Sequence, residues 1–149
     1  MSSTTENESY NPLDVSWVTD EGVTKETVEW AKSFGQFLSS SQKKTKPMTT
    51  GQLRRFFGEV KRIDSNVLKN KNAIPMLKPI LAYAVGRDKN NGGYNRTLIK
   101  EFEQEISKAI DAIRIDDDDH LKSDYKNFVK ILESIVAYHK YYGGQENTN

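Results

Sequence analysis

The sequence predicts an all-α protein, a single compact bundle of about five helices with a flexible N-terminal arm and a short C-terminal tail. Apolar residues recur at helical spacing in five segments, cap-forming residues precede several of them, and no segment alternates like a strand. The chain has 149 residues, 36% of them hydrophobic, which is enough for one buried core. We expect an acidic arm that is disordered or loosely docked (1–22), one helical domain (23–144) and a polar tail (145–149).

The first helix is expected from Thr24, a candidate N-cap, to about residue 38. One face carries the residues expected to point inward, namely Val28, Ala31, Phe34 and Leu38. Trp30 and Phe37 lie on a neighbouring flank, so the helix is either well covered on two sides or partly an interface. We expect Trp17 of the arm to dock locally, and residues 39–47 to form a basic, flexible linker.

The second helix is expected from a capping box at Thr49 and Gln52 to about residue 68. Its apolar residues cover an arc of about 140°, and they are Leu53, Phe56, Phe57, Val60, Ile63, Val67 and Leu68. The opposite side carries four cations that we call the basic strip, namely Arg54, Arg55, Lys61 and Arg62. Gly58 lies among them, where the missing side chain allows a bulky partner to approach the backbone.

Asp64 falls inside the apolar arc of this helix. It either pairs with a buried partner such as His139 or a tyrosine, or marks a less covered end of the helix. For His139 itself, a hydrogen-bonded position in the core is the simpler interpretation, because it projects from an apolar arc of the last helix.

The third helix is expected to begin at Asn72 and to be kinked or split by Pro79, which lies beyond its first turn. A loop follows over residues 87–93. The fourth helix is expected over residues 95–115 with one apolar arc: Leu98, Ile99, Phe102, Ile106, Ala109, Ile110 and Ile113. The fifth follows the aspartates at 116–119, whose charges suit a helix N-terminus, and ends at Gly143. Its inward side carries Leu121, Tyr125, Phe128, Val129, Leu132, Ile135, Val136 and His139.

The net charge of +1 hides a strong segregation along the chain. Residues 40–100 contain fourteen Lys and Arg against three acids, whereas the remainder contains eight Lys and Arg against eighteen acids. This asymmetry indicates a polyanionic partner for the basic part, or neutralisation between the two parts or between neighbouring copies.

The sequence offers little catalytic chemistry. It has no cysteine, two histidines and none of the usual nucleophile, zinc-helix, phosphate-loop or dinucleotide motifs. A weak metal site for a hydrolase at Asp116–His120 is conceivable, but helix capping accounts for the same residues. We expect no catalytic residue, no metal, no cofactor and no small-molecule substrate. The polar N-terminus and the lack of a long apolar run favour a cytoplasmic protein without membrane contact.

Several further cations are candidates for polyanion binding. Lys46 lies just upstream of the basic strip, Lys78 and Arg87 belong to the third helix, and Lys130 and Lys140 share a flank of the fifth. The alternative is an ordinary solvated face with helix-surface ion pairs. The basic elements carry few aromatic residues that we expect to be exposed, so the expected contacts are with phosphates and sugars, independent of base sequence.

Three blocks resemble the signature of the small subunit of type III-A CRISPR–Cas effector (Csm) complexes. They are TTGQLRRFFGEVKRI at 49–63, LKPILAYAVGR at 77–87, and FVK followed by IVAYHK within 128–140. The resemblance extends over about residues 45–144 in the same order, and no fixed pattern is assigned to residues 1–44.

The resemblance implies a non-catalytic all-α subunit in antiviral defence, whose copies stack along the backbone subunits beside the large subunit. It implies that the positive face holds guide RNA and target RNA, and that other faces meet neighbouring subunits, so that residues 23–144 serve RNA binding and assembly. The matching cations are the basic strip with Lys78 and Arg87, followed by Lys130 and Lys140. That the whole strip touches RNA is inferred from its geometry. The alternative function is that of a helical DNA-binding regulator.

Overall fold

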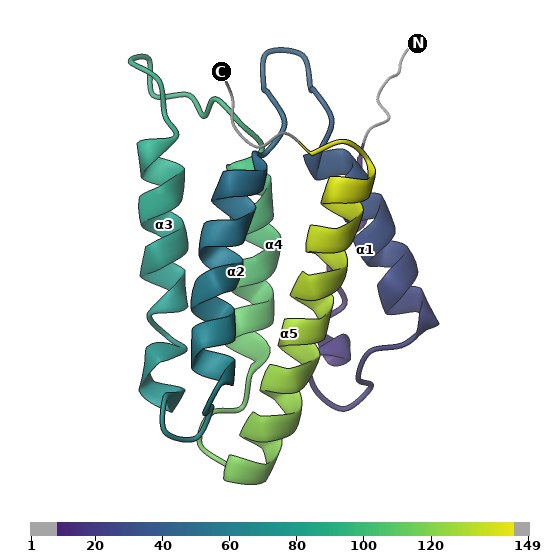
Figure 1. Cartoon of the computed structure of the whole chain (residues 1–149), viewed down its shortest axis with the longest axis vertical. Helices are drawn as coiled ribbons and strands as arrows, with labels where there is room; N and C mark the ends of the chain where they lie inside the picture. The colour runs from purple at the N-terminus through teal and green to yellow at the C-terminus, as the bar shows by residue number, and fades with distance from the viewer. Residues whose placement is uncertain (1–8, 145–149) are drawn as a thin grey trace.

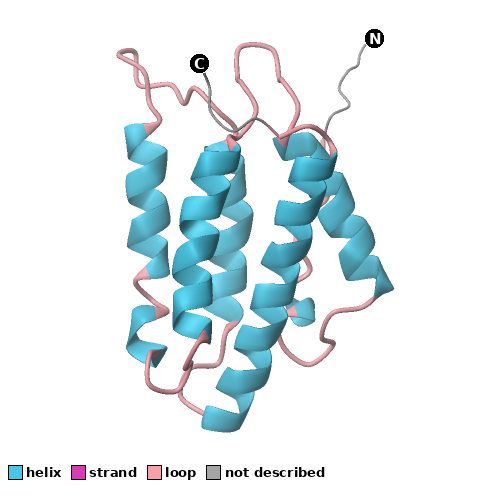
Figure 2. Ribbon diagram, viewed as in Figure 1, coloured by secondary structure: helices cyan, strands magenta, loops and turns pink. Residues whose placement is uncertain are grey.

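Five α-helices make up most of the structure, a computed structural model that describes residues 9–144. They are α1 (Lys25–Leu38), α2 (Thr50–Asp64), α3 (Leu77–Arg87), α4 (Ile99–Ala112) and α5 (Asp118–Tyr141). Two short 3-10 turns, η2 (Val15–Trp17) and η3 (Lys71–Ala73), accompany them. Figure 2 shows helices and loops but no strand in residues 9–144, so the predicted fold class is confirmed.

The helices run roughly along one direction (Figure 1). In that view α2 stands in front of α4, with α3 on one side and α5 on the other, and α1 lies beyond α5. The outward side of α2 therefore remains uncovered by another helix. Within residues 9–144 none of the helices combines the length and the apolarity that crossing a bilayer requires.

The apolar face of α2 is buried in the middle of this arrangement. Leu53, Phe56, Val60 and Ile63 are each at most 4% exposed. The Phe56 ring meets Phe102 of α4 edge to face at 5.7 Å between centroids. The Tyr125 hydroxyl of α5 donates a hydrogen bond of 2.7 Å to the Val60 carbonyl oxygen. These contacts on two sides determine which way α2 is turned about its axis.

Helix starts follow the capping residues found in the sequence. The Gln52 amide nitrogen donates to the Thr49 hydroxyl at 3.0 Å, and the Thr49 amide donates to the Gln52 side chain at 2.9 Å, which confirms the predicted capping box. Thr24 caps α1 as expected. The expected third helix from Asn72, split or kinked at Pro79, is wrong: η3 is a separate turn, helical structure is interrupted at residues 74–76, and α3 begins at Leu77. Pro79 therefore lies in the first turn of α3, where backbone amides have no intrahelical acceptor and a proline is tolerated.

Two further predicted boundaries are wrong. The second helix ends at Asp64 rather than near residue 68, because turns follow in which the Asn66 side chain accepts from the Lys69 amide at 3.2 Å. Asp64 is exposed and lies 3.9 Å from Lys61, so it marks the less covered end of α2. The fourth helix begins at Ile99, not 95, because the preceding residues pair with other loops.

The expected inward face of α1 is also partly wrong. Val28 is 37% exposed, whereas Trp30 and Phe37 on the flank are buried. The arm covers that flank: the Trp30 indole donates to the Asn11 carbonyl at 2.7 Å, and the Tyr10 ring lies 4.7 Å from the Phe37 ring. The helix is thus covered on two sides, by α5 and by the arm.

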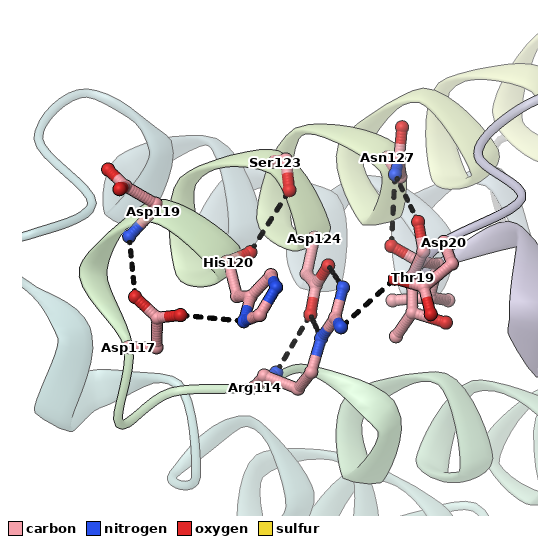
Figure 3. Close-up of polar contacts among 10 residues, drawn as sticks. Thr19, Asp20, Arg114, Asp117, Asp119, His120, Ser123, Asp124 and Asn127 are labelled. Atoms are coloured by element: carbon pink, nitrogen blue, oxygen red, sulfur yellow. Dashed lines mark hydrogen bonds and ion pairs between the residues drawn. The ribbon is translucent and has the colours of Figure 1, made fainter.

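The described part of the arm packs more extensively than the docking of Trp17 alone. Leu13 and Val18 are buried together with Trp17. Its end is held by α5, where the Asn127 amide donates to the Val18 carbonyl oxygen at 2.9 Å (Figure 3). Expectations for residues 1–8 and for the polar tail at 145–149 lie outside the described residues.

One arginine joins the arm, the α4–α5 connection and α5 (Figure 3). The Arg114 guanidinium donates two 2.9 Å hydrogen bonds to the buried Asp124 carboxylate, and the Arg114 amide donates a third of 3.0 Å. The same guanidinium lies 3.0 Å from the exposed carboxylate of Asp20. These contacts raise the pKa of Arg114 and keep it charged.

His139 is a hydrogen-bonded core residue, as expected. It is 1% exposed, and its Nε2 lies 2.6 Å from the Met48 carbonyl oxygen, which makes Nε2 the donor. Burial lowers the pKa of His139, so the ring is neutral at physiological pH.

Two mid-helix glycines are predicted to respond oppositely to alanine. A Cβ at Gly35 would lie 2.8 Å from the Tyr138 Cβ where α1 meets α5, so Gly35→Ala should destabilise the fold by about 1–3 kcal/mol. A Cβ at Gly58 would meet nothing within 4 Å, so Gly58→Ala should stabilise α2 by about 0.5–1 kcal/mol. Urea unfolding of both variants measures the signs; the same sign for both would contradict this packing.

Candidate nucleic-acid interface

The basic strip lies on the outward side of α2. Its four side chains, Arg54, Arg55, Lys61 and Arg62, are all exposed and share an arc of about 120°. Gly58, at the centre of this arc, is exposed and faces open space. A flat or convex polyanion can therefore reach both the cations and the helix backbone.

Ion pairing within the strip is local. Arg62 donates to Glu59 at 2.9 Å, with 59% and 39% of the two side chains exposed. Lys61 lies 3.9 Å from Asp64, a longer and weaker contact. Exposed pairs of this kind contribute at most about 1 kcal/mol, so a phosphate can replace the carboxylate at small cost.

A small depression between α2 and α5 brings another predicted residue to the strip. It is lined by Thr50, Leu53, Arg54, Val136, Ala137, His139 and Lys140. Lys140 therefore lies at the α5 border of the basic strip. Lys130 is exposed on α5 but lies about 80° around that helix from Lys140.

A larger groove lies between α2 and α3 at the end of the bundle where α2 begins and α3 ends. We call it the α2–α3 groove; its volume is about 1390 Å³. Its walls come from α2, α3, the first turn of α4 and two loops, 44–49 and 88–97. Both loops project at the same end of the bundle in Figure 1. Its cationic residues are Lys44, Lys46, Arg55, Arg87, Arg96 and Lys100.

Asp88 organises the floor of the groove. Its carboxylate accepts from the Thr97 amide at 2.9 Å, and from the side chains of Asn95 and Gln52 at 3.2 Å each. These three donors belong to α2 and to the loop that returns to α4. The hydrogen bonds replace water around the carboxylate and connect α2 to the returning loop.

The loop at 39–47, expected to be a flexible linker, is tied to the same region. The Lys46 amide donates to the Arg96 carbonyl at 2.8 Å, and the Leu98 amide donates back to the Lys46 carbonyl at 3.1 Å. Backbone pairing thus brings Lys46 and Arg96 together although they are distant in the sequence.

The predicted cations divide between the two surfaces. Arg55 belongs to both the strip and the groove, and Lys46 and Arg87 line the groove. Lys78 lies elsewhere: it is about 180° around α3 from Arg87 and contacts Asp111 of α4 at 2.8 Å.

Sequence reasoning missed four groove residues. Arg96 lies in the loop that returns to α4, and Lys100 lies in the first turn of α4. No local sequence pattern predicts the course of this loop. Tyr83 and Tyr94 are 69% and 75% exposed, contrary to the expectation of few exposed aromatics. The one available signal was the position of Tyr83 four residues before Arg87, which places both on one side of a helix.

The aspartate run has an internal explanation. Asp117 caps α5, and its carboxylate lies 2.7 Å from His120 Nδ1 (Figure 3). In the part of the chain that the structure describes, no three His, Asp or Glu side chains converge in a way that would hold a metal ion.

Comparison with known protein families identifies a relationship over most of the chain. The family model described as Csm2 Type III-A matches residues 21–145, which include all five helices. No curated protein and no solved structure gives a significant match. The resemblance noted in the three sequence blocks is thereby confirmed at the level of the family.

Removing the Asp88 carboxylate should disorganise the groove. Asp88→Ala leaves three donors without their acceptor, which should destabilise the fold by about 1–3 kcal/mol and speed hydrogen exchange at the Thr97 amide. Asp64→Ala is the matched control, because that carboxylate is exposed and makes only a 3.9 Å ion pair. Equal effects of the two substitutions would show that Asp88 does not hold the groove together.

Proposed function

Since the chain belongs to the Csm2 Type III-A family, the small subunit of type III-A CRISPR effector complexes, we propose that it binds the backbone of guide RNA paired with target RNA. The basic strip makes this contact, and base pairing between the two RNA strands supplies the sequence recognition. The subunit therefore needs charge and shape but no reading of bases.

The exposure of all four strip cations is the observation that carries the proposal. An A-form helix presents phosphates and 2′-hydroxyls along a wide, shallow surface. The strip offers a matching row of cations, and Gly58 leaves room for a ribose or phosphate beside the α2 backbone. Arg87, Lys46 and Lys140 add charge on either side of the strip, with Lys130 and Lys78 further away.

A single copy should bind RNA weakly. Neutralising about four phosphates of a duplex corresponds to a log–log salt slope near −3.6, or a loss of about 150-fold in affinity between about 50 and 200 mM salt. Copies stacked along the backbone subunits act on one duplex together, which raises the effective concentration of each contact. Head-to-tail stacking of neighbouring small subunits requires two complementary faces on each copy.

The Csm2 family is a structural and generally non-catalytic part of the complex. We assign this chain the same role in antiviral defence, in the cytoplasm, with no reaction, cofactor or small-molecule substrate of its own. Its protein partners are the backbone subunits, the large subunit and neighbouring copies.

Reversing the strip tests the proposal. Changing Arg54, Arg55, Lys61 and Arg62 to Glu should lower the affinity for an RNA duplex more than about tenfold at 50 mM salt and bring the salt slope close to zero. The matched control reverses four exposed lysines away from the strip, namely Lys25 and Lys32 on α1, Lys108 on α4 and Lys122 at the opposite end of α5 from Lys140, and should change both quantities little.

Fluorescence anisotropy at several salt concentrations measures both quantities, and circular dichroism checks that helicity is kept. Equal losses in the two variants would mean that net charge, not the strip, determines binding. A strong preference for one duplex DNA sequence would favour the regulator alternative.

A further inference from the structure

Two exposed tyrosines face the cationic α2–α3 groove. Tyr83 projects from α3 and Tyr94 from the loop before α4, and 69% and 75% of these residues are accessible to solvent. Large aromatic side chains in a soluble protein usually bury most of their surface. Two solvent-exposed tyrosine rings beside six cations indicate a ligand that has both aromatic faces and negative charge.

Both tyrosines are held in place. The Arg87 guanidinium lies 5.8 Å from the centroid of the Tyr83 ring, which orients the ring while most of it remains exposed. Tyr94 sits in an ordered turn: its amide donates to the Asn90 side chain at 3.1 Å, and its carbonyl accepts from the Asn90 amide at 2.8 Å. Gly93, with φ of +87°, allows the chain to turn immediately before it.

We propose that the α2–α3 groove binds a short single-stranded segment of RNA, whose bases stack on Tyr83 and Tyr94 while its phosphates contact the surrounding Arg and Lys side chains. The inference rests on the proposed function, because Arg55 belongs to both surfaces. It differs from it in the form of the RNA: a duplex keeps its bases stacked on each other, and only unpaired bases can stack on protein side chains.

The charge balance of the groove supports this occupant. Of its two acids, Asp88 is occupied by three hydrogen bonds from the protein. The Glu101 carboxyl is half-buried, one of its oxygens has no hydrogen-bond partner, and burial raises its pKa, which favours the neutral form. Six cations against two acids give the groove an excess of positive charge.

Size and composition argue against other ligands. A volume of about 1390 Å³ exceeds the usual 300–1,000 Å³ of small-molecule pockets, so the groove accommodates several linked nucleotides. The buried centres of protein–protein interfaces are depleted in charge, especially in Lys, which makes a groove lined by six cations a poor fit for an apolar protein surface.

The test compares two forms of RNA on the full chain. Anisotropy is measured at low salt for a labelled single strand of about eight nucleotides, a length typical of single-strand-binding surfaces, and for an RNA duplex. Tyr83→Ala with Tyr94→Ala should weaken single-strand binding by at least about 5-fold and leave duplex binding within about 2-fold. The corresponding Tyr→Phe pair should retain the affinity, because phenylalanine stacks equally well.

Tyr141→Ala is the matched control, because Tyr141 is also 75% exposed but lies at the end of α5, outside the groove. It should leave single-strand binding unchanged. Unchanged single-strand affinity in the double alanine variant would overturn the inference, as would equal losses for single strand and duplex. A glutamate peptide of matched charge that competes equally well would overturn it too, because charge alone would then account for binding.

The two proposals can fail separately. If the strip reversal weakens duplex binding while the tyrosine variants leave single-strand affinity unchanged, the proposed function is supported and the stacking groove is contradicted. If the tyrosine variants lose single-strand binding while the strip reversal leaves duplex binding intact, the groove proposal is supported and the proposed contact with paired RNA is contradicted.

Discussion

Burial of one face of α2 is the constraint on which the rest of the account depends. Leu53, Phe56, Val60 and Ile63 are enclosed by α4 and α5, and the hydrogen bond from Tyr125 to the Val60 carbonyl links the α2 backbone to α5. Turning α2 enough to hide its cations would expose four large apolar side chains, each worth about 1.5–3 kcal/mol of burial. The core therefore keeps the basic strip in solvent.

The hydrogen bonds around Asp88 bring cations that are distant in the sequence onto one surface. Asp88, at the end of α3, joins Gln52 of α2 to the loop that leads into α4, and backbone pairing attaches the 39–47 loop beside it. Cations from five parts of the chain thereby line one groove next to the strip. Arg55 contributes to both surfaces, so the proposed path of RNA along the strip leads past the mouth of the groove.

Much of this could be predicted from the sequence, because the determining interactions are local. Helical spacing located five helices, and the Thr49–Gln52 capping box and the Thr24 cap follow from backbone rules within one turn. Non-local contacts were beyond such reasoning. Trp30 is buried and Val28 exposed because the arm covers one flank of α1. Tyr83 is exposed because the described chain places no element over that side of α3, and Arg96 reaches the groove through pairing with Lys46.

The most direct test is site-specific cross-linking in the assembled effector complex carrying guide and target RNA. The chain has no cysteine, so Gly58→Cys places a single photoreactive label at the centre of the strip, where a side chain meets nothing within 4 Å. Ser33→Cys on the exposed side of α1 is the control. The account predicts cross-links to RNA from position 58 and to protein or nothing from position 33. RNA cross-links from position 33 alone would contradict it.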